Sequence, residues 1–213
     1  MPYGFLDIAV TPSVRNVQAE MGVDHLWKDF KGSRASDRFT EDEAMFIAAR
    51  DSFYMASVSE TGWPYVQHRG GPRGFLKMID ERTLAFADYR GNLQYISAGN
   101  LAADSRACLF LVDYPHRARL KIYAHVDILS LDADPALTER ITPKGYRAKL
   151  ERIFRLRLDA FDWNCPQHIT PRFTEPEIAE AVRPLRERVS QLEAENAALR
   201  ARLGITGSGD GTS

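Results

Sequence analysis

Basic side chains gather around glycines in residues 67–74, which read Q-H-R-G-G-P-R-G. Arg69 and Arg73 carry positive charge and offer only hydrogen-bond donors, and Lys77 follows soon after. Glycine lets the backbone take unusual dihedral angles and lets a ligand approach main-chain N–H groups. This combination suits a phosphate group. A strand-turn-strand connection with solvated arginines explains the same residues, and the pattern alone does not separate the two.

A second polar cluster, D-Y-R-G-N-L-Q, occupies residues 88–94. It lies where a predicted strand at 83–87 gives way to a predicted helix over 93–102. Asn92 is placed to cap that helix, and the free N–H groups at a helix start favour an anion. An ordinary turn with a capping asparagine is the alternative.

A third cluster consists of Arg117, Arg119 and Lys121, which alternate along a predicted strand and so project to one face. Like charges in a row repel one another unless a negative group lies near them. They indicate either an anion site or a solvated edge strand whose charges prevent aggregation.

Residues 161–173, F-D-W-N-C-P-Q-H-I-T-P-R-F, combine aromatic, amide and imidazole groups between prolines. Trp163 can stack on a planar ring, and Gln167 can donate and accept hydrogen bonds at the edge of such a ring. A loop that closes a barrel around a core tryptophan is the alternative.

Several classes of protein are not indicated by the composition. The chain has 28 basic and 29 acidic residues, so bulk charge gives no reason to expect a nucleic-acid partner. Neither a membrane span nor a leader is recognisable, which predicts a cytoplasmic protein without a membrane partner. The five histidines do not fall at metal-ligand spacings, and no nucleophile elbow, P-loop or dinucleotide motif occurs. We therefore predict no metal ligand and no catalytic side chain.

The spacing of apolar residues predicts a mainly β chain with flanking helices. Apolar residues in 11–30 have a loose helical spacing, and Thr40 with Glu43 forms a capping-box pattern that starts a second helix. At least six antiparallel strands joined by short turns favour a closed or nearly closed barrel, with a sandwich as the alternative. The candidate strands are residues 53–59, 63–69, 74–79, 83–87, 107–114, 119–131 and 152–161.

The C-terminal residues show a heptad pattern, with apolar residues that alternate steps of four and three. Asn196 falls at an a position, where it favours a parallel two-stranded coiled coil. Pro184 is expected to interrupt the helix, so that the sustained coil begins at Leu185. One amphipathic helix lying on its own barrel is the alternative. The seam residues are Ile178, Val182, Leu185, Val189, Leu192, Asn196, Leu199 and Leu203.

The strands and polar clusters of residues 39–173, taken in the order in which they occur along the chain, resemble the pyridoxamine 5'-phosphate oxidase-like, FMN-binding split-barrel family. The resemblance is carried by A-S-V-S-E-T-G-W-P, R-G-G-P-R-G-F-L-K, D-Y-R-G-N-L-Q, A-C-L-F-L-V-D-Y and R-A-R-L-K-I-Y-A-H-V. The second and third of these are similar to a separate flavin-binding subfamily. The resemblance implies a six-stranded antiparallel split β-barrel.

Four segments follow from the resemblance together with the patterns above. Residues 1–38 are expected to form a helical extension that packs on the barrel, and 39–173 the FMN-binding split-barrel domain. Residues 174–204 are expected to form a helix that pairs as a parallel dimeric coiled coil, and 205–213 a disordered tail.

The resemblance further implies a homodimer with FMN in the groove between the barrels. Arg73 and Lys77 match the phosphate-side strand, and Arg119 matches the position where the family places a glutamine against the flavin. The lysine usual at the turn-to-helix position is absent, and Leu93 and Gln94 stand in its place. The predicted cofactor-binding residues are Gln67, Arg69, Arg73, Gly74, Lys77, Asp88, Arg90, Asn92, Gln94, Arg119, Trp163 and Gln167.

The function that the resemblance implies is an FMN-dependent oxidoreductase, of the oxidase or flavin-reductase type, acting on an unidentified small molecule. Flavin chemistry requires no catalytic side chain, in keeping with the motifs above. A flavin-binding sensor without catalysis, and a deazaflavin- or haem-binding protein, are the alternatives.

Overall fold

The computed structural model describes residues 4–27, 37–163 and 167–204. Its contacts divide the chain into two compact units, Met1–Ile169 and Thr170–Ser213. The disordered tail predicted for 205–213 lies outside the described residues. Within those residues, no helix is both long enough and apolar enough to cross a membrane.

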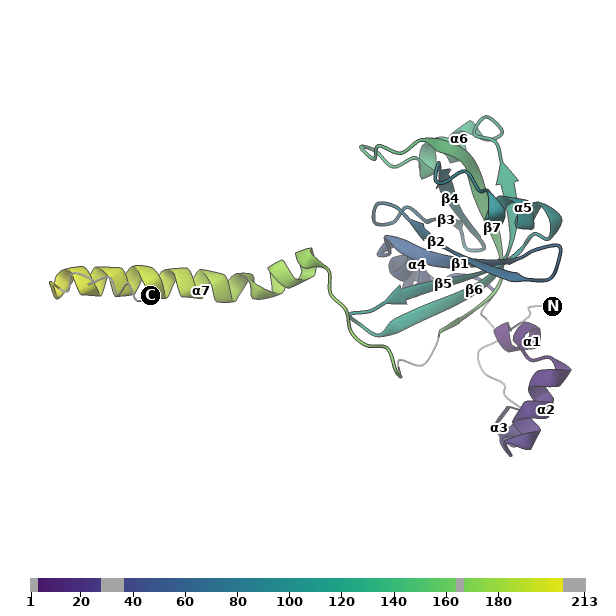
Figure 1. Ribbon diagram of the computed structural model, residues 1–213, viewed down its shortest axis with the longest axis horizontal. Helices are drawn as coiled ribbons and strands as arrows, with labels where there is room; N and C mark the ends of the chain where they lie inside the picture. Colours follow the sequence, from purple (N-terminus) through teal and green to yellow (C-terminus); the bar gives the residue numbers. More distant parts are fainter. Residues whose placement is uncertain (1–3, 28–36, 164–166, 205–213) are drawn as a thin grey trace, which may run out of the picture. The chain divides into compact units, whose positions relative to one another are not determined.

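The first unit is built on one antiparallel sheet with the strand order β2-β1-β5-β6-β7-β4-β3 (Figure 1). The sheet has seven strands, so the prediction of six is wrong. The edge strands are β2 and β3, and the sheet is therefore not closed by strand pairing. The strands are β1 (Ser52–Val58), β2 (Pro64–Gly70), β3 (Lys77–Asp80), β4 (Thr83–Tyr89), β5 (Arg106–Asp113), β6 (Ala118–Leu129) and β7 (Leu150–Trp163).

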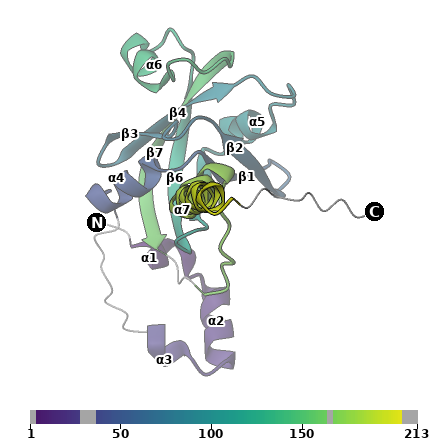
Figure 2. The ribbon, with the colours of Figure 1, turned by 90° about the vertical axis from the view of Figure 1, so that its left-hand side faces the viewer.

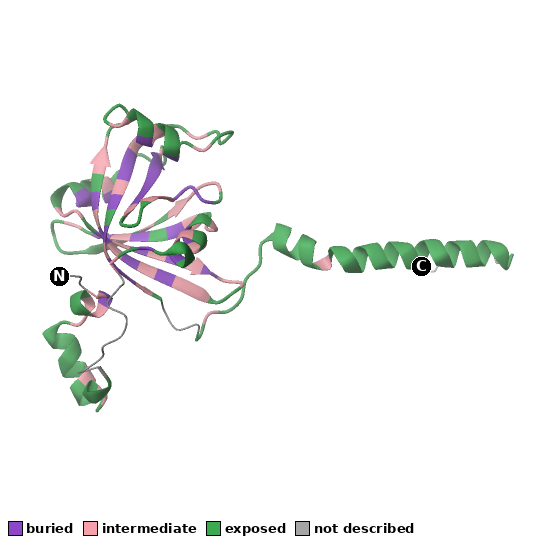
Figure 3. Ribbon diagram, turned by 180° about the vertical axis from the view of Figure 1, so that it is seen from behind, coloured by how far each residue is buried: buried purple, intermediate pink, exposed green. Residues whose placement is uncertain are grey.

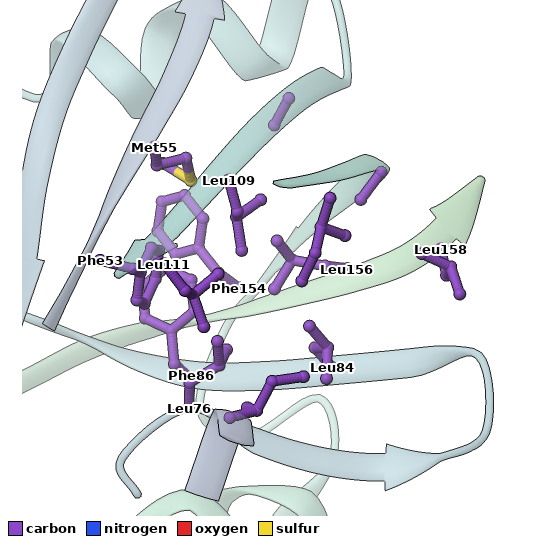
Figure 4. Packing of buried hydrophobic residues seen from close by; sticks show 14 of the residues in the cluster. Phe53, Met55, Leu76, Leu84, Phe86, Leu109, Leu111, Phe154, Leu156 and Leu158 are labelled. Carbon is purple, nitrogen blue, oxygen red and sulfur yellow. The ribbon is translucent and has the colours of Figure 1, made fainter. Parts of the chain in front are cut away.

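Side chains meet across the interior of this curved sheet (Figure 4). Phe53 of β1 lies edge-on to Phe86 of β4, with 5.3 Å between the ring centroids. Phe86 in turn stacks on Phe154 of β7 at 5.0 Å. All three rings are at most 2% exposed. The core thus joins strands that lie far apart in the order of the sheet, as burial of one face of each strand requires.

The long strands β6 and β7 pair with a register shift. Tyr123 lies opposite Ala160 but Ala124 lies opposite Leu158, so one residue of β7 is extra at that point. The imperfect alternation of R-I-F-R-L-R-L-D-A-F, residues 152–161, predicts either an edge strand or a bulged strand, and the bulge is confirmed. β7 is not an edge strand, because it pairs with β4 on its other side.

Helices flank the sheet (Figures 1 and 2). α4 lies against β3, α5 against β1 and β6, and α6 against β4. The capping box is confirmed, because Glu43 accepts hydrogen bonds from Thr40 N at 2.8 Å and from Thr40 Oγ1 at 2.6 Å. The helix predicted in 11–30 is divided into α2 and α3, while α1 and α6 had no clear sequence signal. The helices are α1 (Phe5–Ala9), α2 (Pro12–Glu20), α3 (Asp24–Trp27), α4 (Glu41–Ala48), α5 (Ile96–Ala103), α6 (Pro135–Ile141) and α7 (Glu175–Arg202).

The second unit contains α7, which continues across Pro184. The predicted interruption at this proline is therefore wrong, although the proline does remove one backbone donor. No residue of α7 is buried, whereas buried residues recur along the strands of the sheet (Figure 3). The helix is confirmed, and its pairing stays a prediction.

Candidate functional site

A polar pocket lies where β2 and β4 meet the segment that leads into α5. Its enclosed volume is about 50 Å³. Five of the predicted cofactor-binding residues line it: Gln67, Arg69, Asp88, Asn92 and Gln94. The remaining lining residues are Tyr65, Tyr89, Gly91, Leu93, Tyr95, Ile96, Ser97 and Ala98. The sequence thus predicted the polar core of the pocket and missed the tyrosines and Ser97.

Charges at the inner wall of the pocket are paired. Arg69 donates to Asp88 at 2.6 Å, and Arg152 Nε lies 3.2 Å from the other oxygen of Asp88. Arg69 also lies over the rings of Phe154 and Phe86, at 5.1 and 5.8 Å. The pair therefore links edge strand β2 to β4 across the opening of the sheet, and the Arg69 charge is already opposed by a carboxylate.

Burial controls the titration of this pair. It raises the pKa of Asp88 in spite of the attraction of Arg69 and Arg152, and it lowers the pKa of Arg69 in spite of Asp88. Both pKa shifts show that, for each side chain, the loss of solvation on burial outweighs the attraction between the opposite charges. Arg152 was not predicted, since only the pairing of β4 with β7 sets it opposite Asp88.

The segment that leads into α5 has an uncommon backbone. Leu93 and Tyr95 have φ angles of 65° and 52°, in the left-handed region. α5 begins at Ile96, so the helix predicted from residue 93 starts later and Asn92 is not its N-cap. Asn92 Oδ1 instead accepts from the Gln94 backbone N–H at 3.2 Å, and its Nδ2 donates to Gln94 Oε1 at 3.1 Å. These two hydrogen bonds between Asn92 and Gln94 fix the conformation of the segment where it lines the pocket.

Gln67 is oriented from the opposite wall. Ser97 Oγ donates to Gln67 Oε1 at 2.8 Å, which fixes the carbonyl end of this amide toward α5. The NH₂ end has no hydrogen-bond partner among the residues described. It is therefore available as a donor to a ligand.

The glycine-rich stretch after β2 does not line the pocket. Gly74 has φ 72°, and a Cβ there would lie 2.9 Å from the backbone oxygen of Ala48. Its N–H donates to Arg50 O at 2.7 Å, which holds the stretch against the end of α4. The strand predicted at 74–79 is therefore shorter and begins at Lys77. Gly74 thus serves a close backbone contact, and it does not line the pocket.

The cations near this stretch differ in their partners. Arg73 is exposed and Lys77 is half-buried on β3. Within the described residues neither forms an ion pair. Arg90, in contrast, lies 3.5 Å from Glu151. Arg73 and Lys77 therefore have charge available for a ligand.

Arg119 lies on β6, far along the sheet from the edge strands. Arg117 precedes the strand in a turn with φ 53°, so the predicted row of three cations contains two, Arg119 and Lys121. Lys121 lies 3.3 Å from Asp162 and over the ring of Phe5 at 4.8 Å. The carboxylate of Asp162 therefore neutralises part of the positive charge of Arg119 and Lys121.

Trp163 ends β7, and its indole N–H donates to Glu43 Oε1 at 2.6 Å. Its ring lies edge-on to Phe46 at 4.7 Å, and the residue is 40% exposed. Part of the ring remains open to a ligand even though the N–H is used within the chain. Gln167 follows in an exposed loop, and the neighbouring Cys165 lies outside the described residues.

Three buried polar atoms near the predicted site residues lack a hydrogen-bond partner in the part of the chain that the structure describes: Arg69 Nε, Tyr89 Oη and Arg119 Nε. Burial raises the pKa of Tyr89 to about 12, so its hydroxyl is protonated at neutral pH. Buried polar groups are almost always hydrogen-bonded in proteins. Arg69 and Tyr89 both line the pocket, and so their free donors mark it as a place where an acceptor fits.

A curved antiparallel sheet that is open at its edge strands, with a polar pocket beside one edge, defines an open-barrel protein of the split-barrel kind. The sequence profile described as pyridoxamine 5'-phosphate oxidase matches residues 39–162. The match spans more than half of the 213 residues. The chain belongs to this family, which confirms the resemblance inferred from the sequence.

Solved structures that are similar to this chain have low sequence identity. They include an FMN-binding protein from Syntrophomonas wolfei, with 14% identity, a TM-score of 0.46, and 69% of this chain and 97% of that chain covered. HupZ of Group A Streptococcus has 11% identity and a TM-score of 0.46, with 63% and 99% covered. A Clostridium acetobutylicum protein related to general stress protein 26 has 14% identity and a TM-score of 0.43, with 65% and 95% covered. A comparison with curated proteins found no match.

Proposed function

We propose that the protein is an FMN-dependent oxidoreductase, of the oxidase or flavin-reductase type, that acts on a small molecule. The observation that carries the proposal is the pocket beside β2. It combines amide and hydroxyl groups with two buried donors, Arg69 Nε and Tyr89 Oη, that have no partner within the described part of the chain. Membership of the family supplies the cofactor class.

The donor set fits a flavin mononucleotide. A flavin ring presents carbonyl and nitrogen acceptors along one edge, which suits Gln67 Nε2 and the free donor of Arg69. A phosphate needs cations whose charge is not already paired, and Arg73 and Lys77 meet this requirement. Arg69 and Arg90 meet it less well, because Asp88 and Glu151 oppose them.

The protein's part in the reaction is binding and orientation. When bound, FMN supplies the hydride and electron transfer. Gln67, held by Ser97, would orient the ring edge in the pocket, and Arg73 with Lys77, which do not line the pocket, would bind the phosphate outside it. Arg119 contributes positive charge that favours an anionic ring, while the exposed part of Trp163 and the amide of Gln167 limit access of water. No side chain of the chain has to act as an acid or base.

The enclosed volume of about 50 Å³ is small beside the roughly 300–1,000 Å³ of ordinary ligand pockets. One chain therefore encloses only part of a flavin. We propose that a second subunit completes the groove, so that the binding unit is a homodimer.

The first test is a titration of flavin-free protein with FMN, followed by quenching of flavin fluorescence. Wild type should bind, and Arg73→Ala or Lys77→Ala should weaken binding by about 1.5–3 kcal/mol, which is roughly 10- to 150-fold in Kd. Arg90→Ala is the matched control and should change Kd much less, because Glu151 already opposes its charge. Wild-type protein that fails to bind FMN, but binds a deazaflavin or haem, would replace the cofactor assignment.

A second test separates an enzyme from a sensor. Reduced nicotinamide is added to the FMN-loaded protein without oxygen, and the flavin absorption near its visible maximum is followed. Bleaching, followed by recovery when an acceptor is added, supports the oxidoreductase. A flavin that binds tightly but stays oxidised with every donor tried supports a non-catalytic sensor.

A further inference from the structure

The exposed apolar stripe of α7 is the largest feature that the proposed function does not use. Its members recur at steps of three and four, and five of them are between 46% and 71% exposed: Leu185, Val189, Leu192, Leu199 and Leu203. A hollow in the helix surface follows the same stripe and is lined by Val189, Leu192, Glu193, Asn196, Ala197 and Arg200. An apolar stripe of this regularity is suited to a second helix.

α7 needs such a partner for physical reasons. Its 28 residues bury no side chain, so the packing that normally stabilises a helix is missing from it. Isolated helices gain little from propensity alone in water, and several large apolar side chains remain exposed to solvent here. Burial of this stripe would stabilise both the helix and its partner.

We infer that residues 185–203, which comprise most of α7 and its C-cap Leu203, pair with the same residues of a second copy of the chain, in parallel and in register, as a two-stranded coiled coil. Val189 occupies an a position, and Leu192 and Leu199 occupy d positions. Branched residues at a with leucine at d favour two parallel strands. Asn196, at the a position between these layers, would meet the Asn196 of the other copy, where the two amides can bond to each other.

The antiparallel arrangement fits these residues less well. There, a positions face d positions, so Asn196 would lie against a leucine and lose hydrogen bonds to water without replacement. A buried amide without a partner costs about 1–3 kcal/mol. The parallel arrangement avoids this cost at both copies.

Charges beside the stripe agree with the same arrangement. In a parallel pair, a g residue faces the e residue five positions later in the partner. Arg188 then faces Glu193, and Glu195 faces Arg200, so both contacts are attractive. Each contact occurs twice in a symmetric pair.

Ion pairs within α7 lie on its other side. Arg183 lies 2.8 Å from Glu180 and 3.4 Å from Glu187, at the b and f positions that face away from the stripe. Across residues 167–204, Arg188, Glu193 and Arg200 form no ion pair within the chain. These three flanking charges are thus available to a partner, whereas Glu195 also accepts a hydrogen bond from Gln191 at 3.0 Å.

The test is disulfide cross-linking of the full-length chain in a Cys108→Ser, Cys165→Ser background. Leu199→Cys places a thiol at a d position, and Ala201→Cys places one at the outward f position as the matched control. Under mild oxidation, Leu199→Cys should form covalent dimers at least 10-fold faster than Ala201→Cys. Cross-linking is read on a denaturing gel, so the result does not depend on flavin binding.

Orientation is tested by mixing Val189→Cys and Leu199→Cys chains, an a and a d position, after a size tag has been added to one of them. The parallel pair gives each residue linked to its own counterpart. A preferred link between positions 189 and 199, which face each other when Asn196 lies against Leu192, would show an antiparallel pair and overturn the inference. Equal rates for Leu199→Cys and Ala201→Cys, or no dimer at all, would overturn it too, as expected if α7 binds a different protein or its own chain.

A charge swap tests the same pairing through residues that lie beside the apolar stripe. In the Leu199→Cys chain, Arg188→Glu should slow cross-linking severalfold, because residue 188 then repels Glu193 of the other copy. Adding Glu193→Arg should restore the rate, since the pair is attractive again with its charges reversed. No recovery in the double variant would mean that these residues do not face each other.

Discussion

The sheet and α7 both carry apolar residues at regular spacing, but those residues end in different surroundings. In the sheet, Phe53, Phe86 and Phe154 are almost completely buried against one another. In α7, every seam leucine is exposed. Regular spacing therefore predicts an amphipathic element in both regions, while the number of chains needed to bury it depends on contacts that are distant in sequence or lie in another molecule.

A local motif that occurs in both regions makes the same point. Thr40 with Glu43 begins α4, and Thr174 with Glu177 begins α7, each with a threonine N–H donating to the glutamate, at 2.8 and 2.7 Å. Glu43 is 4% exposed and also accepts from Trp163, whereas Glu177 is exposed. The motif sets the helix start in each case, and the first copy is buried and joined to Trp163 at the end of β7.

The largest expected effect comes from opening the core. Phe86→Ala should lower the free energy of unfolding by about 3–5 kcal/mol, because it removes contacts with Phe53, Phe75 and Phe154. Leu192→Ala, on α7, should change the unfolding of the sheet by less than about 0.5 kcal/mol. Urea unfolding followed by tryptophan fluorescence measures both. An equal loss in the two variants would mean that the two regions unfold as one.

A smaller effect is expected from the backbone contact of Gly74. Gly62 has a similar left-handed φ of 84° but nothing within 4 Å of its Cβ position, so Gly62→Ala should cost only the conformational penalty of about 1–2 kcal/mol. Gly74→Ala adds the overlap with Ala48 O and should cost about 1–2 kcal/mol more. Thermal unfolding of the two variants gives the difference. Equal losses would show that the stretch moves away from α4 without cost.

Much of the sheet could be predicted, because alternation and short turns are local. The strands β1, β2 and β4 to β7 were found within about two residues. β3 was misplaced because residues 71–76 curl onto α4, a contact that the sequence does not show. The start of α5 was misplaced because Leu93 and Tyr95 adopt left-handed angles that their residue types do not favour.

The site was predicted by residue type better than by geometry. Gln67, Asp88 and Gln94 were expected near a ligand and do line one pocket. Arg69 and Arg73 looked alike in the sequence, yet one is paired with Asp88 and the other is exposed. This difference between the two arginines depends on the contact of Arg69 with Asp88. The two residues are 19 positions apart, on strands that are not neighbours in the sheet.

The smallest effect distinguishes the two capping boxes. Burial raises the pKa of Glu43, but the hydrogen bonds from Thr40 and Trp163 outweigh it and leave the pKa below its ordinary value of 4.5. A lowered pKa means that the carboxylate stabilises the fold above pH 4.5, and that this stability is lost as the pH falls through the folded-state pKa. Glu43→Gln should therefore cost about 1 kcal/mol at neutral pH.

Glu177→Gln is the matched control, because it changes the same motif at an exposed helix start. It should leave the unfolding of the sheet unchanged within about 0.5 kcal/mol at every pH. The difference between wild type and Glu43→Gln should shrink as the pH falls below 4.5, since protonation removes from wild type the charge that the variant lacks. A difference that stays constant down to low pH would show that Glu43 stabilises the link from α4 to Trp163 by its shape and not by its charge.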